Sequence, residues 1–340
     1  RRAGHRTPRS LCLTTDAYGL FVEQGSLRAV IQQELGRKSF DDMRWEEIWD
    51  AALRIRNSFL RAPVPREVVA AVETIVEEQL SSTALAVRSS APGEDSEGAS
   101  FAGLHDSFVG VSGLEAVVEA VRGVWASLWS DRALLYRREL DIDPETSSMA
   151  VLIQELEDGA VSGIAFGRHP TDPDLVVIES VYGLNQGLVD GTIEPDRWHV
   201  ERASGRIVEH APPPARRRLV ATGSRTVVKA VPPELTSIPP LDEPAVARVF
   251  RAVCDLEEVF GSAQDVEWTL ADGELVLLQS RPMTTSAADS GDQRAWYLSL
   301  TRSLENLGGL IPQRGRGHGR VAARRDRRFP AGQYRLRVWI

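Results

Sequence analysis

Two strand-like runs, residues 265–271 and 274–282, flank the dipeptide Asp272-Gly273. Apolar and polar residues alternate along the first run, and an Asp-Gly pair between two such runs is a strong signal for a β-hairpin. The chain therefore contains an antiparallel strand pair, which neither an all-helical fold nor a strict strand–helix–strand alternation provides.

Helical and strand patterns are mixed along the rest of the chain. Apolar residues recur at helical spacing over 66–80 and 114–139, and a third helix is expected over 243–260, ended by Gly261. Val- and Ile-rich runs predict strands, a second hairpin is expected to turn at 203–205, and proline-rich stretches predict loops. The strands are 83–90, 148–156, 161–167 and 174–180, and the loops are 211–220 and 231–244. This mixture suits a two-lobed α+β fold better than a doubly wound sheet.

The last hairpin carries candidate metal ligands. Glu267 offers a carboxylate and Gln279 an amide oxygen, both hard ligands suited to Mg²⁺, and Arg281 lies on the same strand face as Gln279. A three-residue loop would place Glu267 opposite Gln279, whereas a two-residue Asp-Gly turn would place Glu267 opposite Leu278. The metal interpretation requires the longer loop; the alternative is that these are ordinary solvent-facing residues of a half-buried hairpin.

The strand that ends in Arg88 leads into a long loop of small residues. Serines and glycines such as Ser100 and Gly103 give this loop many hydrogen-bond donors and little bulk, so it can fold over a polyphosphate. Arg88, at the end of the strand, could then contact a phosphate that is bound under this loop. The alternative is an exposed linker with a helix-capping serine.

Two weaker signals accompany these. The backbone at Gln154, Glu155 and Leu156 can pair with an adenine edge, although most such strands are simply core. A glycine-punctuated turn with Gln186 and Asp190 suits the approach of a sugar or phosphate. The sequence contains neither the G-x-x-x-x-G-K-[ST] nor the G-x-G-x-x-G pattern, so P-loop and Rossmann folds lose their main support.

Composition narrows the class of protein further. The net charge of −8 argues against a nucleic-acid partner. Cys12 and Cys254 are far apart in the sequence and typical of reduced thiols. No apolar run approaches the roughly 18 residues of a membrane span and no signal peptide is visible, so a cytoplasmic protein without a membrane partner is expected.

Taken together, several long segments resemble the ATP-binding N-terminal region of phosphoenolpyruvate synthase (pyruvate, water dikinase), which pyruvate phosphate dikinase and rifampicin phosphotransferase share. The resemblance spans about residues 11–285 and follows the family's order. It rests on LCLTTDAYGLFV (11–22), AVRSSAPGEDSEGASFAGLHDSFVGV (86–111), VWASLWSDRALLYRR (124–138), MAVLIQEL (149–156), VSGIAFGRHP (161–170), VYGLNQGLVDGTIEPDRW (181–198) and FGSAQDVEWTLADGELVLLQSRPMTT (260–285).

The resemblance implies an ATP-grasp fold that transfers phosphate from Mg-ATP to a histidine on a separate swivelling domain, with pyruvate as the commonest final acceptor. Arg88 would contact the phosphates, and Arg281 would stabilise the transferring phosphate. Glu267 and Gln279 would hold Mg²⁺. The implied nucleotide contacts are Ser100, Ala102 and Gly103 in the mobile loop, Gln154, Glu155 and Leu156 at the adenine, and Gln186 near the sugar or phosphate.

The chain departs from the family pattern in four ways. A glycine-rich stretch with a phosphate-binding lysine is missing, and so are the histidine domain and the C-terminal barrel that binds pyruvate. The family pattern G-L-G-E reads Gly183-Leu184-Asn185-Gln186 here. The basic end of the chain is expected to be either a disordered arm or an aberrant, truncated or frame-shifted gene end.

These patterns predict a division of the chain and leave its activity open. The chain is either an active phosphotransferase module, the nucleotide subunit of a split synthase or antibiotic phosphotransferase, or an inactive nucleotide-binding remnant. The predicted parts are an atypical end (1–10), the N-terminal lobe and central region (11–200), the C-terminal lobe with the metal hairpin (201–290), the start of a helical linker (291–312) and a basic tail (313–340).

Overall fold

The structure is a computed structural model, and it describes residues 4–80, 84–92, 104–222 and 225–283. The predicted linker and basic tail, 291–340, lie outside the described residues. The described residues contain both helices and strands, which confirms the α+β class.

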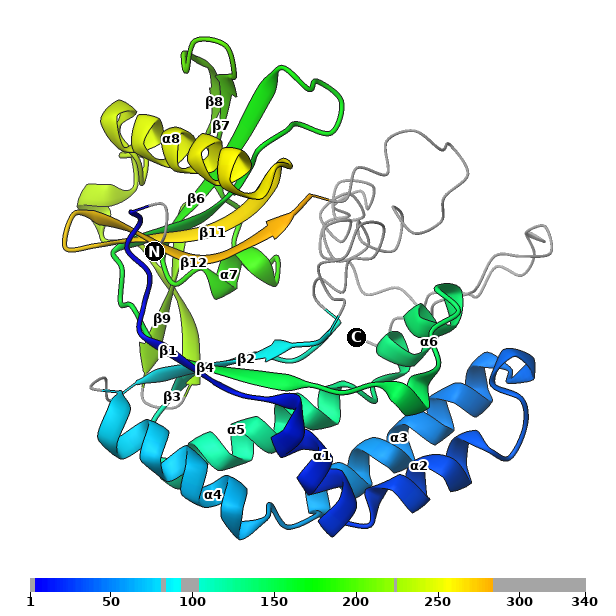
Figure 1. The fold of residues 1–340 in the computed structure, drawn as a ribbon. Coiled ribbons are helices and arrows are strands. Elements are labelled where there is room, and N and C mark those ends of the chain that lie inside the picture. Colours follow the sequence, from blue (N-terminus) through cyan, green and yellow to red (C-terminus); the bar gives the residue numbers. More distant parts are fainter. Residues whose placement is uncertain (1–3, 81–83, 93–103, 223–224, 284–340) are drawn as a thin grey trace, which may run out of the picture. The chain divides into compact units, whose positions relative to one another are not determined.

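The strands form two sheets (Figure 1). A four-stranded antiparallel sheet has the order β1-β4-β2-β3, with β1 at Ser10–Leu13, β2 at Leu85–Ser90, β3 at Phe108–Val111 and β4 at Ala150–Glu155. Six strands of an eight-stranded sheet follow the order β10-β9-β6-β5-β11-β12. The other two branch from it: β7 pairs with β6, and β8 pairs with β7. Its strands are β5 (Val161–Phe166), β6 (Leu175–Gly183), β7 (Asp196–Glu201), β8 (Ile207–Ala211), β9 (Arg217–Thr222), β10 (Arg225–Ala230), β11 (Gln264–Ala271) and β12 (Glu274–Pro282).

Helices pack against one side of the four-stranded sheet and share one apolar core with it. Rings of Phe21 and Trp125 stack at a centroid distance of 4.9 Å, and the indole N–H of Trp129 donates to the Tyr18 hydroxyl at 3.1 Å. Such ring pairs add to the free energy of area burial alone. The helices of this region are α1 (Thr15–Gln24), α2 (Leu27–Leu35), α3 (Trp45–Arg61), α4 (Arg66–Glu73), α5 (Leu114–Ser127) and α6 (Asp131–Glu139).

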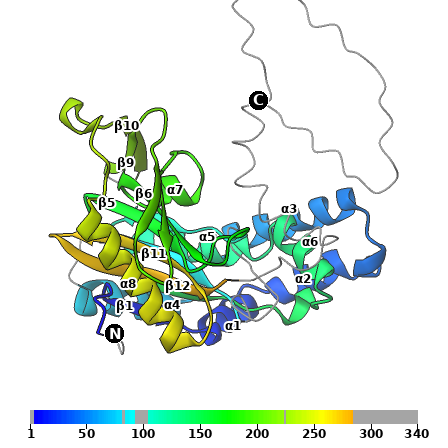
Figure 2. The ribbon, with the colours of Figure 1, turned by 90° about the horizontal axis from the view of Figure 1, so that it is seen from above.

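Helix α8 (Glu243–Phe260) packs across the eight-stranded sheet and lies beside β11 and β12 (Figure 2). The Asp242 side chain caps its first turn, and Gly261 ends it in the left-handed conformation with φ 74°. Val266 and Trp268 of β11 are buried in the core beneath α8. Because strand residues alternate between faces, Asp265 and Glu267 lie on the opposite face of the sheet.

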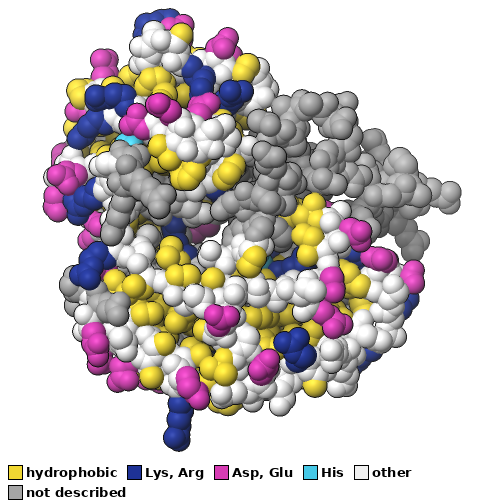
Figure 3. Space-filling view, viewed as in Figure 1, with side chains coloured by type: hydrophobic (Ala, Val, Ile, Leu, Met, Phe, Trp, Pro, Cys, Tyr) yellow, Lys and Arg dark blue, Asp and Glu magenta, His cyan; other side chains and the backbone are white. Residues whose placement is uncertain are grey.

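The short helix α7 (Gln186–Val189) follows β6, and the segment before β1 joins the two sheets. Arg6 bridges to Val276 of β12, and its guanidinium pairs with Glu274 at 3.0 Å and Glu157 at 3.4 Å. From there the chain runs into β1 of the small sheet (Figure 1). On the face seen in Figure 3, acidic and basic side chains are interspersed over the described part of the chain.

Several predicted elements need correction. The helix expected over 114–139 is two helices, because the chain turns after Ser127 and the Ser130 hydroxyl accepts from the Ala133 N–H at the start of α6. The helix over 66–80 continues beyond Glu73 as a π-helical turn. The prediction of a loop over 211–220 is wrong at its end, because β9 begins at Arg217 and pairs with β10. Pairing with a neighbouring strand decides the structure there despite the run of arginines.

Candidate functional site

The hairpin β11–β12 has an irregular register that places two predicted ligands opposite each other. Asp272 and Gly273 form a two-residue turn with φ of 52° and 77°. The register then shifts between Glu267 and Trp268, so that Glu267 pairs with Gln279. The predicted pairing is confirmed, but the three-residue loop invoked for it is wrong: a β-bulge supplies the extra residue instead.

Arg88 reaches this pair from the other sheet. One of its Nη atoms donates to Gln279 Oε1 at 3.0 Å and the other donates to Glu267 Oε2 at 2.9 Å. Arg88 stands 179 residues from Glu267 in the sequence, and the side chains of the pair are only 18% and 8% exposed. A charged contact between the two sheets is therefore built from β2 and the β11–β12 hairpin.

The environment of Glu267 keeps its carboxyl ionised. Burial would raise the pKa of this carboxyl, but the positive charges of Arg88 and Arg281 outweigh burial, and the pKa is held below its ordinary value. Asn185 contributes to the lowering as a nearby amide donor. At neutral pH the buried Glu267 carboxylate therefore carries a negative charge.

Arg281 is held beside this cluster by a partner that the sequence prediction missed. Its Nε and Nη2 atoms donate to Asp265 Oδ2 at 2.9 and 2.7 Å. Asp265 and Arg281 are direct cross-strand partners, two residues along each strand from the pair Glu267 and Gln279. Alternation along β11, which puts Asp265 on the face of Glu267, is the signal that identifies it.

The strand end proposed for adenine is already engaged in the small sheet. Gln154 is buried and its Nε2 donates to the Ser10 hydroxyl at 3.1 Å. The backbone N–H groups of Glu155 and Leu156 donate to the carbonyls of Arg9 and Ala84. An adenine contact at these three residues would use other atoms, and their role stays a prediction.

The turn after β6 carries polar side chains with unused hydrogen-bonding capacity. Within the described part of the chain, the Oε1 atom of Gln186 and both amide atoms of Asn185 are buried without a hydrogen-bond partner. Asp190, in contrast, accepts from the backbone and hydroxyl of Thr192 and so shapes its own turn. The predicted loop contacts Ser100, Ala102 and Gly103 lie outside the described residues.

Glu267 and Gln279 offer a carboxylate and an amide oxygen, which are ligand types that Mg²⁺ accepts. A carboxylate and an amide oxygen converge on one guanidinium, which shows that the pair accommodates a cation. Among the described residues, no group of three or more His, Cys, Asp or Glu side chains could hold a metal ion. A divalent ion at this pair would take its remaining oxygens from water and substrate phosphates, as Mg²⁺ commonly does.

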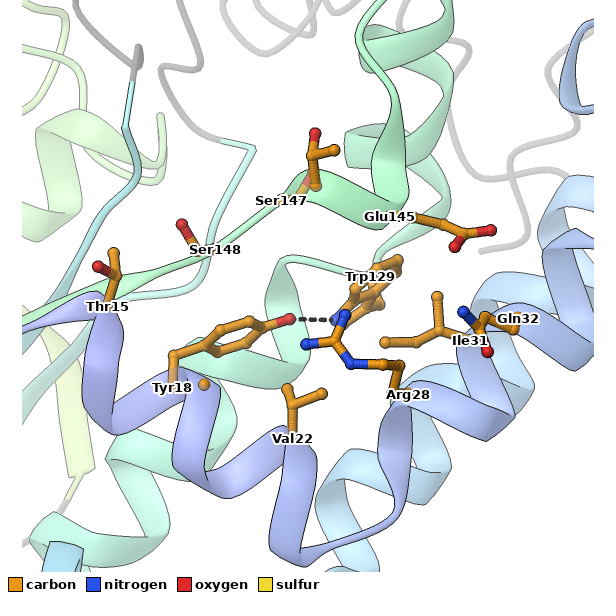
Figure 4. A pocket seen from close by; sticks show the side chains of 12 residues that line it. Thr15, Tyr18, Val22, Arg28, Ile31, Gln32, Trp129, Glu145, Ser147 and Ser148 are labelled. Atoms are coloured by element: carbon orange, nitrogen blue, oxygen red, sulfur yellow. Dashed lines mark hydrogen bonds between the residues drawn. The ribbon is translucent and has the colours of Figure 1, made fainter.

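A cavity of about 320 Å³ lies elsewhere, between α1, α2 and the segment 145–148 (Figure 4). The Tyr18 and Trp129 rings and the Arg28 side chain face it, and the Tyr18–Trp129 hydrogen bond runs along its wall. None of its lining residues belongs to the cluster at Arg88, so the cavity and the charged cluster are separate features.

Fold and cluster together define an α+β protein with a buried, cation-accepting pair of oxygens facing an arginine from a second sheet. The chain belongs to the family described as pyruvate phosphate dikinase, AMP/ATP-binding domain, which it matches over residues 1–299. It is 32% identical over 294 residues to a probable phosphoenolpyruvate synthase of Methanothermobacter thermautotrophicus, covering 84% of this chain and 42% of that protein. It is 34% identical over 300 residues to a rifampicin phosphotransferase of Streptomyces sviceus, covering 86% and 34%.

The chain thus spans less than half the length of these two relatives. Among solved structures, the D-Ala:D-Ser ligase VanG of Enterococcus faecalis is similar with a TM-score of 0.33 at 13% identity, over 91% of this chain and 58% of that one. Within the described residues, no helix is both long enough and apolar enough to cross a membrane.

Proposed function

We propose that this chain is the nucleotide-binding part of a phosphotransferase, in which two sheets form an ATP-grasp clamp and phosphate passes from Mg-ATP to a histidine on a separate swivelling domain. The observation that carries the proposal is the contact of Arg88 with both Glu267 and Gln279 across the two sheets. Membership of an AMP/ATP-binding domain family and relatives named phosphoenolpyruvate synthase and rifampicin phosphotransferase support it.

Glu267 and Gln279 would hold Mg²⁺, which would neutralise charge on the bound phosphates. Glu267 suits this role because its pKa is lowered and its carboxylate is ionised at neutral pH. Arg88 and Arg281 would stabilise the negative charge that spreads over the transferring phosphate. Asp265 holds Arg281 through two hydrogen bonds, which fixes the direction of its guanidinium.

Other residues would hold the nucleotide itself. Residues 100–103 would cover the phosphates through Ser100, Ala102 and Gly103, and residues 154–156 would receive the adenine. Gln186, whose amide oxygen is buried without a partner among the described residues, would face the sugar or a phosphate. Both cysteines are free thiols, which favours a reducing, cytoplasmic location.

The phosphate acceptor is proposed in two steps. A histidine domain, supplied by another polypeptide or by a further part of this protein, would receive the phosphate first. Pyruvate would be the final acceptor, and the relatives named rifampicin phosphotransferase make an antibiotic the alternative.

The test is to incubate the chain with Mg²⁺, a separately produced swivelling domain from a phosphoenolpyruvate synthase, and ATP labelled in turn at the β- and γ-phosphate. We expect acid-labile label on the histidine of that domain. Arg281→Ala should abolish it, while Arg206→Ala, at a side chain that is 66% exposed, should not. Binding of ATP without any label on the histidine would contradict transfer and identify a nucleotide-binding remnant.

A further inference from the structure

Asn185 occupies an unusual position for an amide side chain. It lies between the end of β6 and the first residue of α7, and it is only 6% exposed. It stands at the N-cap of α7, yet its side chain does not cap the helix. Within the described residues neither Nδ2 nor Oδ1 has a hydrogen-bond partner. Buried amides are nearly always hydrogen-bonded because desolvating one is costly, so this side chain calls for a ligand or a change of partner.

The fold places Asn185 next to the charged cluster. Leu184, its neighbour in the chain, packs in the same apolar cluster as Ile164 of β5. Ile164 is the direct cross-strand partner of Glu267 on β11. The Asn185 amide lies close enough to the Glu267 carboxyl to help lower its pKa, but it makes no hydrogen bond of ordinary geometry there.

The Glu267 carboxylate thus has one charged donor in contact and one neutral amide nearby. Arg88 donates to Glu267 Oε2 and carries a positive charge. If a divalent ion took its place, one carboxylate oxygen would face the ion and the other would still need a donor. A guanidinium in that second position would repel the ion, whereas the neutral amide of Asn185 would not.

We propose that Asn185 is a positioning residue of the metal site, whose amide holds the oxygen of Glu267 that the divalent ion leaves free. The inference rests on the proposed function and deepens it, because it gives Glu267 a neutral partner for the metal-bound state. Asn185 touches neither substrate nor reacting atoms in this role; it acts through Glu267.

The test measures binding of Mn²⁺ to the full chain by electron paramagnetic resonance, in the presence of the non-hydrolysable nucleotide AMP-PNP. Asn185→Ala and Asn185→Leu should raise the Mn²⁺ dissociation constant roughly tenfold. Their affinity for AMP-PNP in EDTA should stay within about twofold of wild type, since the role concerns the metal. Asn185→Leu should melt at the same or a higher temperature, because replacing an unpartnered buried amide with an apolar group of similar shape removes a desolvation cost.

Ser180 provides a matched control. Its hydroxyl is also buried without a partner among the described residues, but alternation along β6 places it on the α8 side of the sheet with Ile178 and Tyr182. Ser180→Ala should leave Mn²⁺ affinity unchanged.

Three results would overturn the inference. If both Asn185 variants bind Mn²⁺ as tightly as a wild-type chain that does bind it, the inference fails and the proposed function stands. If they lose metal-free AMP-PNP binding to the same extent as Mn²⁺ binding, Asn185 serves the nucleotide and the inference fails. If the wild-type chain binds neither AMP-PNP nor Mn²⁺ with it, the proposed function fails as well.

Discussion

The two sheets bury different kinds of side chain. The helices that cover the small sheet bury apolar and aromatic residues against it, among them Phe21, Phe59 and Trp125. The large sheet buries a comparable apolar core under α8, but its opposite face carries a mainly polar and charged row beside a smaller apolar cluster. The row runs from Gln279 to Glu267 and, across the apolar Ile164, to Glu179 and Arg197.

The difference separates residues that specify the fold from residues that the fold tolerates. An apolar core is stabilised simply by its removal from water. A buried ion pair commonly contributes no more than well-packed apolar residues of the same volume would. The pairs Arg88–Glu267 and Arg281–Asp265 are therefore weak evidence for stability and stronger evidence for a site.

Removing Arg88 should have the largest effect. Arg88→Ala is expected to lower phosphate transfer about 10³-fold, the scale of a missing phosphate-stabilising arginine. It should also destabilise the chain by roughly 3–5 kcal/mol, because Glu267 is left as an unpaired buried charge. Transfer assays and urea unfolding measure the two effects separately.

A double variant distinguishes the two effects of Arg88. Arg88→Met combined with Glu267→Gln removes both charges, so stability should return toward wild type while transfer stays lost. If the double variant recovered transfer, Arg88 and Glu267 would serve only to stabilise the fold. The distinction between an apolar core that specifies the fold and a charged row that forms a site would then fail.

The aromatic core should show the opposite pattern. Phe59 is fully buried between Tyr18 and Phe21. Phe59→Ala should cost about 3–5 kcal/mol of unfolding free energy, because it removes buried area and leaves a cavity. Nucleotide affinity per folded molecule should not change, which titration calorimetry below the melting temperature would check. A selective loss of nucleotide affinity would mean that the core also shapes the site.

Local pattern was enough for most strands and for α8, whose apolar spacing and terminal residues agree with tertiary packing. Local pattern failed where contacts between segments distant in the sequence decide the secondary structure. The run around Arg217 looks like a loop until β10 pairs with it, and the apolar spacing over 114–139 does not reveal that Ser130 starts a new helix.

The candidate site shows the same limit. Turn chemistry alone gives a two-residue Asp-Gly turn, and only the bulge restores the pairing of Glu267 with Gln279. The contact of Arg88 with these residues joins two sheets and is not a local property of either segment. Alternation could have identified Asp265, whereas no sequence pattern shows that the amide of Asn185 is buried without a partner in the described structure.

The pH dependence of stability should be smaller and specific to the charged row. Because the pKa of Glu267 is lowered in the folded chain, its ionised form stabilises the fold above the unfolded-state pKa of about 4.3. That contribution is lost as the pH falls through the folded-state pKa. The difference in melting temperature between wild type and Glu267→Gln should therefore narrow from pH 6 to below about pH 4. A constant difference would show that the charge of Glu267 contributes nothing.

The smallest predicted effect tests whether a destabilising change in the helices that cover the small sheet leaves metal binding unaffected. The Ser130 hydroxyl accepts from the Ala133 N–H at 3.1 Å and is the cap that separates α5 from α6. Ser130→Ala should cost about 1 kcal/mol, and Ser130→Thr should retain most of the cap. Since the cap lies in the small-sheet region, Mn²⁺ and AMP-PNP affinities should match wild type at temperatures where the chain is folded. If Ser130→Ala weakened metal binding, the stability of the helices on the small sheet would be coupled to the metal affinity of the charged row.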